Sequence, residues 1–176
     1  MKIFLDCSDV DLIKHGFESG LVDGVTTNPS LMLKAGKNPM DVLKEISEIF
    51  PFHSSISAEV VGDTVDSMLE EAEEYLQIGP NITIKVPCTR TGLKACLELS
   101  KIDVAVNVTL IFSAAQAILA SKAGATYVSP FIGRLNDQYW DGISLVEEIS
   151  DVFTTHSSKT EILAASIREP IQVAKC

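Results

Sequence analysis

The chain has 176 residues, 46% of them hydrophobic, and its 14 basic and 24 acidic side chains give a formal net charge of −10. This length and composition allow a buried core, so disorder is excluded and a single domain over residues 1–176 is expected. The acidic balance argues against nucleic acid as a partner, because its phosphates would be repelled. No apolar run approaches the ~20 residues of a spanning helix, so no membrane association is expected.

The four cysteines and three histidines show no CxxC spacing and no clustering, so we expect neither a disulfide framework nor a metal site. The N-terminal stretch becomes charged at Asp6 after three apolar residues, which is too short for a signal peptide. No GxGxxG follows an expected strand, and a nucleotide cofactor is therefore not expected. These features predict a cytoplasmic protein.

Short β-rich runs alternate with longer segments in which apolar residues recur at helical spacing. In chain order we expect a strand at 3–6, a helix at 8–18, a strand at 24–28, a helix at 39–50, a strand at 56–61, a helix at 64–78, a strand at 81–86, a helix at 91–101, a strand at 104–110, a helix at 113–123, a strand at 127–131, a helix at 142–153, a strand at 161–166 and the start of a helix at 169–176. Ser8 is the expected N-cap of the first helix, and Pro39 stands in the first turn of the second. This alternation is typical of βαβ units and a parallel sheet, which places the chain in the α/β class.

Polar residues at the strand ends favour a closed (β/α)8 barrel over an open doubly wound sheet. The carboxyl ends of barrel strands converge on one site, whereas those of an open sheet spread along an edge. Alternate residues of a strand share a face, so pairs at spacing two are expected to point into the barrel. These pairs are Thr26 and Asn28, Ser57 and Glu59, Thr83 and Lys85, Asn107 and Thr109, and Ser166 and Arg168.

The expected elements fall short of a complete barrel. Seven strands and six following helices are predicted, and residues 169–176 provide only the start of a seventh helix. A TIM-type barrel has eight of each and ~200 residues or more. The expectation is therefore a (β/α)8 TIM-type barrel that is truncated after strand 7 and the start of helix 7.

Lys85 is the sharpest chemical signal, because it lies in the apolar stretch Ile82–Pro87. A buried ammonium is costly unless it is paired or put to use. Burial in general favours a neutral amine, which can attack a carbonyl and form a Schiff base. The alternative interpretation is a lysine on an edge strand that reaches solvent.

Two carboxylates and two arginines also follow strands. Asp6 and Glu59 suit the proton transfers that Schiff-base chemistry needs, although Asp6 is equally interpreted as an acid before a helix. Arg134 and Arg168 suit a phosphate, because guanidinium presents a planar donor fork. The alternative for the arginines is a pair of surface salt bridges.

Seven motifs in chain order resemble the transaldolase family, specifically its short bacterial branch, which includes fructose-6-phosphate aldolase. They occupy residues 3–6 (IFLD), 24–30 (GVTTNPS), 57–60 (SAEV), 84–87 (IKVP), 107–113 (NVTLIFS), 123–134 (AGATYVSPFIGR) and 165–168 (ASIR). The resemblance spans nearly the whole chain. Each motif alone is moderately specific, and all seven in register are very specific.

The resemblance implies a class I aldolase mechanism without metal or organic cofactor, in which Lys85 is the Schiff-base lysine. It implies that Asp6 is the general acid/base at the substrate C4 hydroxyl, and that Glu59 and Thr109 hold a proton-relaying water. The implied substrate contacts are Asn28, Asn107 and Ser129 to the hydroxyls of the three-carbon fragment, Phe131, and Arg134, Ser166 and Arg168 to the phosphate.

The implied reaction transfers a three-carbon dihydroxyacetone unit from fructose 6-phosphate or sedoheptulose 7-phosphate to an aldose phosphate, in the non-oxidative pentose phosphate pathway. The implied partners are these sugar phosphates and, as in relatives, the other subunits of a ring-built decamer. Fructose-6-phosphate aldolases tend to carry Gln in place of Glu59 and Tyr in place of Phe131, so transaldolase activity is favoured. Two alternatives stay open: a fructose-6-phosphate aldolase, and a non-catalytic remnant, because relatives continue through an eighth strand and a terminal helix.

Overall fold

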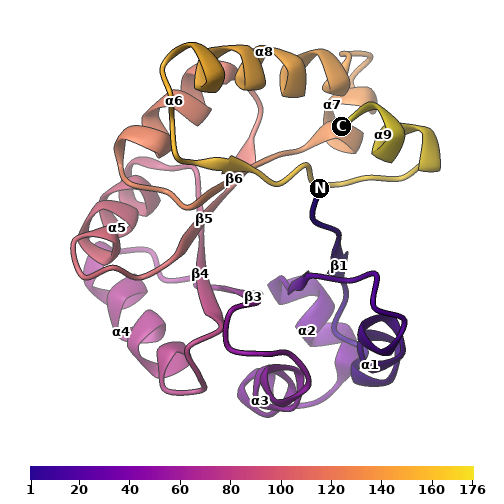
Figure 1. Cartoon of the computed structure of the whole chain (residues 1–176). Coiled ribbons are helices and arrows are strands. Elements are labelled where there is room, and N and C mark those ends of the chain that lie inside the picture. Colours follow the sequence, from indigo (N-terminus) through magenta and orange to yellow (C-terminus); the bar gives the residue numbers. More distant parts are fainter. The chain divides into compact units, whose positions relative to one another are not determined.

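A computed structural model describes residues 1–176, apart from the side chain of Ala35. The chain forms two compact units, Met1–Lys85 and Val86–Cys176. Within each unit parallel strands alternate with helices, which the reader can follow in Figure 1 along the colours from indigo to yellow. The predicted α/β class and the parallel β/α arrangement are therefore confirmed.

The first unit pairs its strands in chain order, β1 to β2, β2 to β3 and β3 to β4. The strands are β1 (Phe4–Asp6), β2 (Gly24–Thr26), β3 (Ser55–Glu59) and β4 (Ile82–Pro87), and β4 continues past Lys85 into the second unit. The helices are α1 (Val10–Glu18), α2 (Pro29–Ala35), α3 (Pro39–Ile49) and α4 (Val65–Leu76). The middle residues of β3 and β4 are buried on both faces, as parallel strands covered by helices require.

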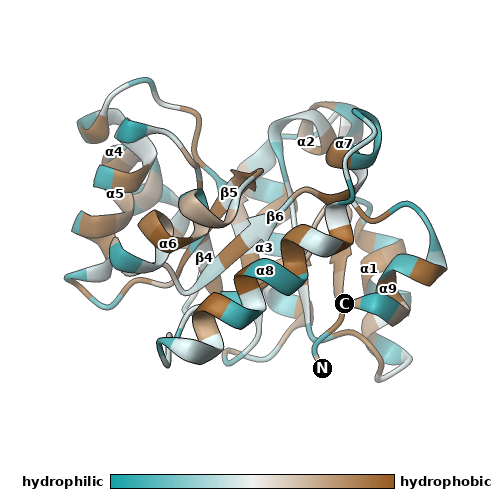
Figure 2. Cartoon of the chain, turned by 90° about the horizontal axis from the view of Figure 1, so that it is seen from above, coloured by the Kyte–Doolittle hydropathy of each residue, from teal (hydrophilic) through white to brown (hydrophobic). Residues whose placement is uncertain are grey.

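The second unit pairs β5 with β6 and β6 with β7. Its strands are β5 (Val106–Ile111), β6 (Tyr127–Pro130) and β7 (Glu161–Ile162), and its helices are α5 (Arg90–Ser100), α6 (Ala114–Lys122), α7 (Ile132–Asn136), α8 (Gly142–Thr155) and α9 (Pro170–Lys175). Figure 2 shows hydrophobic and hydrophilic segments alternating along α8. Leu145, Val146, Ile149 and Phe153 form its buried side, at the spacing of an amphipathic helix.

Three predicted strands extend two residues or more beyond the observed carboxyl end: 24–28, 56–61 and 161–166. β3 ends at Glu59 rather than at residue 61, and for the other two strands the reasons are local. β2 ends at Thr26 rather than at residue 28, because the Asn28 side chain accepts a hydrogen bond from the Leu31 amide and caps α2. Helix α2 was not predicted. β7 ends at Ile162 rather than at residue 166, and Ser166 has φ 57°, a left-handed conformation outside the extended region of a regular strand.

Two smaller expectations are also corrected. The N-cap of α1 is Asp9 rather than Ser8, because the Asp9 carboxylate accepts from the amides of Asp11 and Leu12. Ser8 instead donates through its hydroxyl to the carbonyl of Leu31, at 2.9 Å. Helix α7 was likewise not predicted, since its five residues are too short to show a helical period. No helix in the described part of the chain is long and apolar enough to cross a membrane.

Candidate active site

Lys85 and Glu59 form a close ion pair in the first unit. They are register partners on β4 and β3, and Lys85 Nζ lies 3.0 Å from Glu59 Oε2. Their side chains are only 7% and 16% exposed, so the two charges compensate each other away from bulk water. The alternative of an edge lysine reaching solvent is therefore wrong. The register of β3 and β4, which places the two residues opposite each other, produces this contact.

Thr27 supplies the second contact of the lysine. Lys85 Nζ donates a hydrogen bond to the Thr27 carbonyl at 3.0 Å. Thr27 is itself fixed, because its amide and its hydroxyl both donate to the Ser57 carbonyl, at 3.1 and 2.8 Å. The amine thus lies between one carboxylate and one carbonyl oxygen, both acceptors, on a rigid strand.

Asp6 stands at the end of β1 and is exposed. Its Oδ1 accepts a hydrogen bond from the hydroxyl of its register partner Thr26, at 2.9 Å. The helix-capping role that the alternative gave to such an acid belongs to Asp9. Asp6 is thus a solvent-accessible carboxylate with one donor, a suitable state for a group that exchanges protons.

Asn28 and Glu59 both line a cavity of about 470 Å³ in the first unit. The lining continues over Thr27 and the apolar side chains of Met32 and Val61. The Asn28 side chain uses its carbonyl oxygen to cap α2. The prediction that Thr26 and Asn28 share a strand face fails, since Asn28 lies beyond the strand.

In the second unit, Asn107 and Ser129 lie side by side on β5 and β6. Ser129 Oγ donates to Asn107 Oδ1 at 2.8 Å, and the two residues are 2% and 0% exposed respectively. Buried polar groups on parallel strands are costly unless paired, and this bond pairs them. The prediction that Asn107 and Thr109 both belong to one strand is confirmed.

Thr109 has a buried hydroxyl that lacks a hydrogen-bond partner among the described residues. A buried, unsatisfied hydroxyl is rare in folded proteins and costs stability. The next residue, Leu110, has φ 61°, and the pairing of β5 with β6 shifts between Val108 and Ile111. A bulge of this kind re-aims side chains beside functional sites.

Phe131 follows β6 and is the N-cap residue of α7. Its amide donates to the Ile111 carbonyl at 3.0 Å, and its ring meets that of Phe112 edge-on with centroids 5.8 Å apart. The first turn of α7 then carries Gly133 and Arg134, and Arg134 is exposed. An aromatic ring, Phe131, and a cation, Arg134, thus lie within four residues of each other after the end of β6.

Ser166 and Arg168 approach the start of α7 from the segment after β7. Gly133 donates its amide to the Ser166 carbonyl at 3.0 Å. Arg168 donates through Nη2 to Asp137 Oδ2 at 2.7 Å and through Nη1 to Asp137 Oδ1. The predicted shared strand face of Ser166 and Arg168 is wrong, because neither residue lies in a strand. The surface salt bridge considered as the alternative for the arginines does exist at Arg168.

The charge at this turn is set by two arginines and one carboxylate. The hydrogen bond from Arg168 holds the pKa of Asp137 below its ordinary value, and the positive charges of Arg168 and Arg134 act in the same direction. The same hydrogen bond raises the pKa of Arg168. Both shifts favour the charged forms of Asp137 and Arg168, and the cluster sets two guanidinium groups against one carboxylate.

Sequence reasoning missed four residues that shape these groups: Thr27 through its carbonyl, Gly133, Asp137 and Gln172. Asp137 had a weak signal, three residues after Arg134 on a helical turn. No group of three or more His, Cys, Asp or Glu in the described part of the chain could hold a metal ion.

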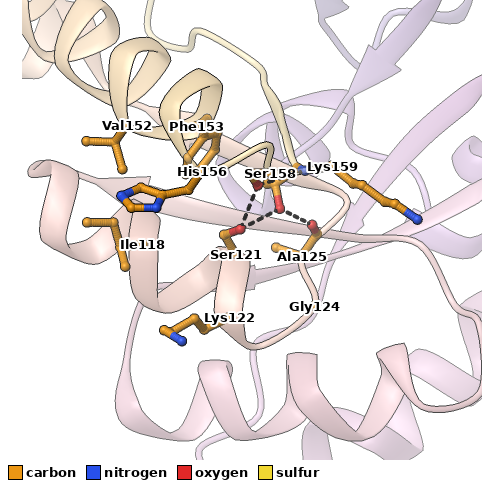
Figure 3. A pocket seen from close by; sticks show the side chains of 11 residues that line it. Ile118, Ser121, Lys122, Gly124, Ala125, Val152, Phe153, His156, Ser158 and Lys159 are labelled. Carbon is orange, nitrogen blue, oxygen red and sulfur yellow. Dashed lines mark hydrogen bonds between the residues drawn. The ribbon is translucent and has the colours of Figure 1, made fainter.

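A larger cavity of about 710 Å³ lies elsewhere in the second unit, between α6, α8 and the segment before β7 (Figure 3). The hydroxyl groups in its wall have hydrogen-bond partners there. Ser121 Oγ and Ser158 Oγ are 2.8 Å apart, and the Thr160 hydroxyl donates to the Ala125 carbonyl at 2.8 Å. Ile118, Val152 and Phe153 supply apolar walls. These bonds tie the start of β7 to α6, which indicates a structural role.

Comparison with known proteins identifies the sequence class. The family described as Transaldolase/Fructose-6-phosphate aldolase matches residues 3–176. A probable transaldolase of Clostridium kluyveri is 53% identical over 176 residues, which are 100% of this chain and 81% of that protein. A probable transaldolase of Geotalea daltonii is 54% identical over 173 residues, 98% of this chain and 80% of that protein.

Solved structures are similar in fold alone. A member of the enolase superfamily from Agrobacterium tumefaciens matches 94% of this chain with a TM-score of 0.66 and 15% identity. A putative isomerase from Sinorhizobium meliloti matches 98% of it with a TM-score of 0.68 and 11% identity. The chain spans 41% and 46% of those two proteins, respectively.

Proposed function

Because the chain belongs to the transaldolase/fructose-6-phosphate aldolase family, we propose that it is a transaldolase acting through a Schiff base on Lys85. The observation that carries the proposal is the buried Lys85 amine, held 3.0 Å from the Glu59 carboxylate on a rigid strand. The first substrate is a ketose phosphate, fructose 6-phosphate or sedoheptulose 7-phosphate. The reaction belongs to the non-oxidative pentose phosphate pathway.

Imine formation uses the ion pair directly. A proton passes from the Lys85 ammonium to the Glu59 carboxylate, and the neutral amine adds to the C2 carbonyl of the ketose. The hydroxyl of the resulting carbinolamine takes up the proton held by Glu59 and leaves as water, and an iminium remains on Nζ. Glu59 is proposed to exchange these protons with a bound water, and the unpartnered hydroxyl of Thr109 is proposed to hold a water as well.

Carbon–carbon cleavage follows from the iminium, which is an electron sink. Asp6 takes the proton of the C4 hydroxyl, the C3–C4 bond breaks, and its electron pair forms an enamine on Nζ. Glyceraldehyde 3-phosphate leaves. The enamine then adds to the aldehyde carbon of erythrose 4-phosphate, Asp6 returns its proton to the new hydroxyl, and hydrolysis of the imine releases sedoheptulose 7-phosphate.

The polar groups of the second unit are proposed to bind the substrate. Asn107 and Ser129 offer a buried amide and hydroxyl to the sugar hydroxyls. In the first unit, Asn28 is proposed to contact a sugar hydroxyl as well. Arg134, Ser166 and Arg168 offer two guanidinium groups and a hydroxyl to the phosphate. Phe131 supplies an apolar wall. All four cysteines of the described chain are free thiols, which supports a reducing compartment such as the cytoplasm.

The test is acceptor dependence in a purified sample. Fructose 6-phosphate with erythrose 4-phosphate should yield sedoheptulose 7-phosphate and glyceraldehyde 3-phosphate in equal amounts. Fructose 6-phosphate alone should release little dihydroxyacetone. Steady release of free dihydroxyacetone without an acceptor would instead identify a fructose-6-phosphate aldolase, and the absence of both reactions in a folded sample would identify a non-catalytic relative.

A further inference from the structure

Asp137 forms a bidentate pair with one edge of the Arg168 guanidinium. Nη1 and Nη2 donate to the two carboxylate oxygens, and the Nη2–Oδ2 distance is 2.7 Å. This end-on pairing uses one face of the donor fork and directs the second face, formed by Nε and an Nη, away from Asp137. The guanidinium therefore has a fixed orientation and a second edge that is able to bind an anion.

That second edge lies beside Gly133. A Cβ placed on Gly133 would overlap the Ser166 carbonyl oxygen and would stand 2.8 Å from Arg168 Nε and 2.9 Å from Ser166 Oγ. Glycine at this position therefore lets the segment with Ser166 and Arg168 pass close to α7, which brings the Arg168 Nε–H and the Ser166 hydroxyl near the same point. An oxyanion that approaches Arg168 from solvent would meet both donors, whereas a residue larger than glycine at position 133 would displace the Ser166 backbone and the Arg168 side chain.

The backbone around this space is also held. Gln172, which is 6% exposed, accepts the Arg168 amide at 2.8 Å and the Glu169 amide at 3.2 Å. Gly133 donates its amide to the Ser166 carbonyl at 3.0 Å. Arg168 is therefore fixed at its backbone by Gln172 and at its tip by Asp137.

We propose that Asp137 is a positioning residue, which holds the Arg168 guanidinium toward Gly133 and Ser166 and so makes the site prefer phosphorylated substrates. The inference rests on the proposed function, in which Ser166 and Arg168 bind the substrate phosphate. Electrostatics alone predicts the opposite effect, since a carboxylate beside two arginines weakens the attraction for an anion. The sign of the change on removing Asp137 therefore separates positioning from mere charge.

The experiment measures the affinity for inorganic phosphate by calorimetry, and kcat and KM with fructose 6-phosphate, in four proteins: the natural chain, Asp137→Asn, Asp141→Asn and Gly133→Ala. Asp141→Asn is the matched control, because it removes the same charge four residues away and asparagine still caps α8. Asp137→Asn should weaken phosphate binding about tenfold, which corresponds to about 1.4 kcal/mol, and raise KM far more than it changes kcat. Asp141→Asn should leave the affinity unchanged or slightly stronger, and Gly133→Ala should lose more affinity than Asp137→Asn.

Asp137→Glu keeps a carboxylate and should recover part of the lost affinity. Tighter phosphate binding in Asp137→Asn would overturn the inference and make Asp137 a competing anion, and unchanged binding would reduce the pair to a surface salt bridge. Natural protein that binds no phosphate would also contradict it. Phosphate binding needs no turnover, so an inactive protein that still loses phosphate affinity in Asp137→Asn would refute the proposed function and leave this inference standing.

Discussion

Glu59 Oε2 lies 3.0 Å from Lys85 Nζ, and the two residues face each other across the β3–β4 pairing. Both side chains are largely removed from water. A buried pair of this kind adds little net stability as a unit, because desolvation offsets the attraction, but breaking it leaves an uncompensated charge. The pair thus ties the stability of β4 to the group that is proposed to perform the chemistry.

Replacement of Glu59 should therefore destabilise the fold, and the loss should be larger when the Lys85 ammonium keeps fewer hydrogen-bond acceptors. Glu59→Ala leaves the Lys85 ammonium with the Thr27 carbonyl and should cost about 3 kcal/mol. Glu59→Gln keeps an acceptor oxygen and should cost less. Urea denaturation measures both free energies of unfolding, and equal stabilities of the two variants and the natural protein would show that the pair is not coupled to the fold.

Thr109→Val should have opposite effects on stability and activity. The hydroxyl is buried without a partner in the described chain, so its replacement by a methyl group removes a desolvation cost of about 1–3 kcal/mol and should raise the thermal midpoint. Imine formation and hydrolysis should slow, because the proposed relay water loses a ligand.

Ser129→Ala is the matched control for that substitution. Its hydroxyl is also buried but donates to Asn107 Oδ1, so its loss should lower the thermal midpoint. A Thr109→Val variant that is less stable than the natural protein, or equally fast in imine exchange, would argue against the assigned role of Thr109.

Arg134→Ala should discriminate between phosphorylated and free substrates. Its guanidinium is exposed and adds positive charge beside Asp137, as does Arg168. Steady-state kinetics should show a KM for fructose 6-phosphate that is raised about tenfold or more. The KM for free dihydroxyacetone, measured in the reverse reaction, should change little. Equal effects on both substrates would remove Arg134 from the phosphate contact.

Cys96 should resist alkylation in the folded protein. Burial raises the pKa of its thiol to about 12 from an ordinary value of 9.0, so the reactive thiolate stays scarce between pH 8 and pH 9. Iodoacetamide at pH 8, read by peptide mass spectrometry, should modify the exposed Cys176 well before Cys96. Unfolding in urea should equalise the two rates, and fast labelling of Cys96 without urea would contradict its burial.

Helices and strands in which apolar residues recur at a regular spacing could be predicted from the sequence. Lys85 and Glu59 lie in the strands predicted for them, but their contact depends on the register between β3 and β4, which spacing along one strand does not determine. The segments after β2, β6 and β7 could not be read, because there capping and turns replace strand geometry. Asn28 caps α2, and Ser166 takes a left-handed conformation, so neither obeys the alternation that suggested its position. Asp137 was missed because its role depends on Arg168, 31 residues away in the sequence.

Borohydride trapping tests the central claim most directly. The protein is incubated with fructose 6-phosphate, reduced, digested and analysed by peptide mass spectrometry, with Lys85→Ala in parallel. The account predicts a three-carbon or six-carbon sugar adduct on the peptide that contains Lys85 and none in Lys85→Ala. An adduct on another lysine, or no adduct in a sample that unfolds cooperatively, would contradict it.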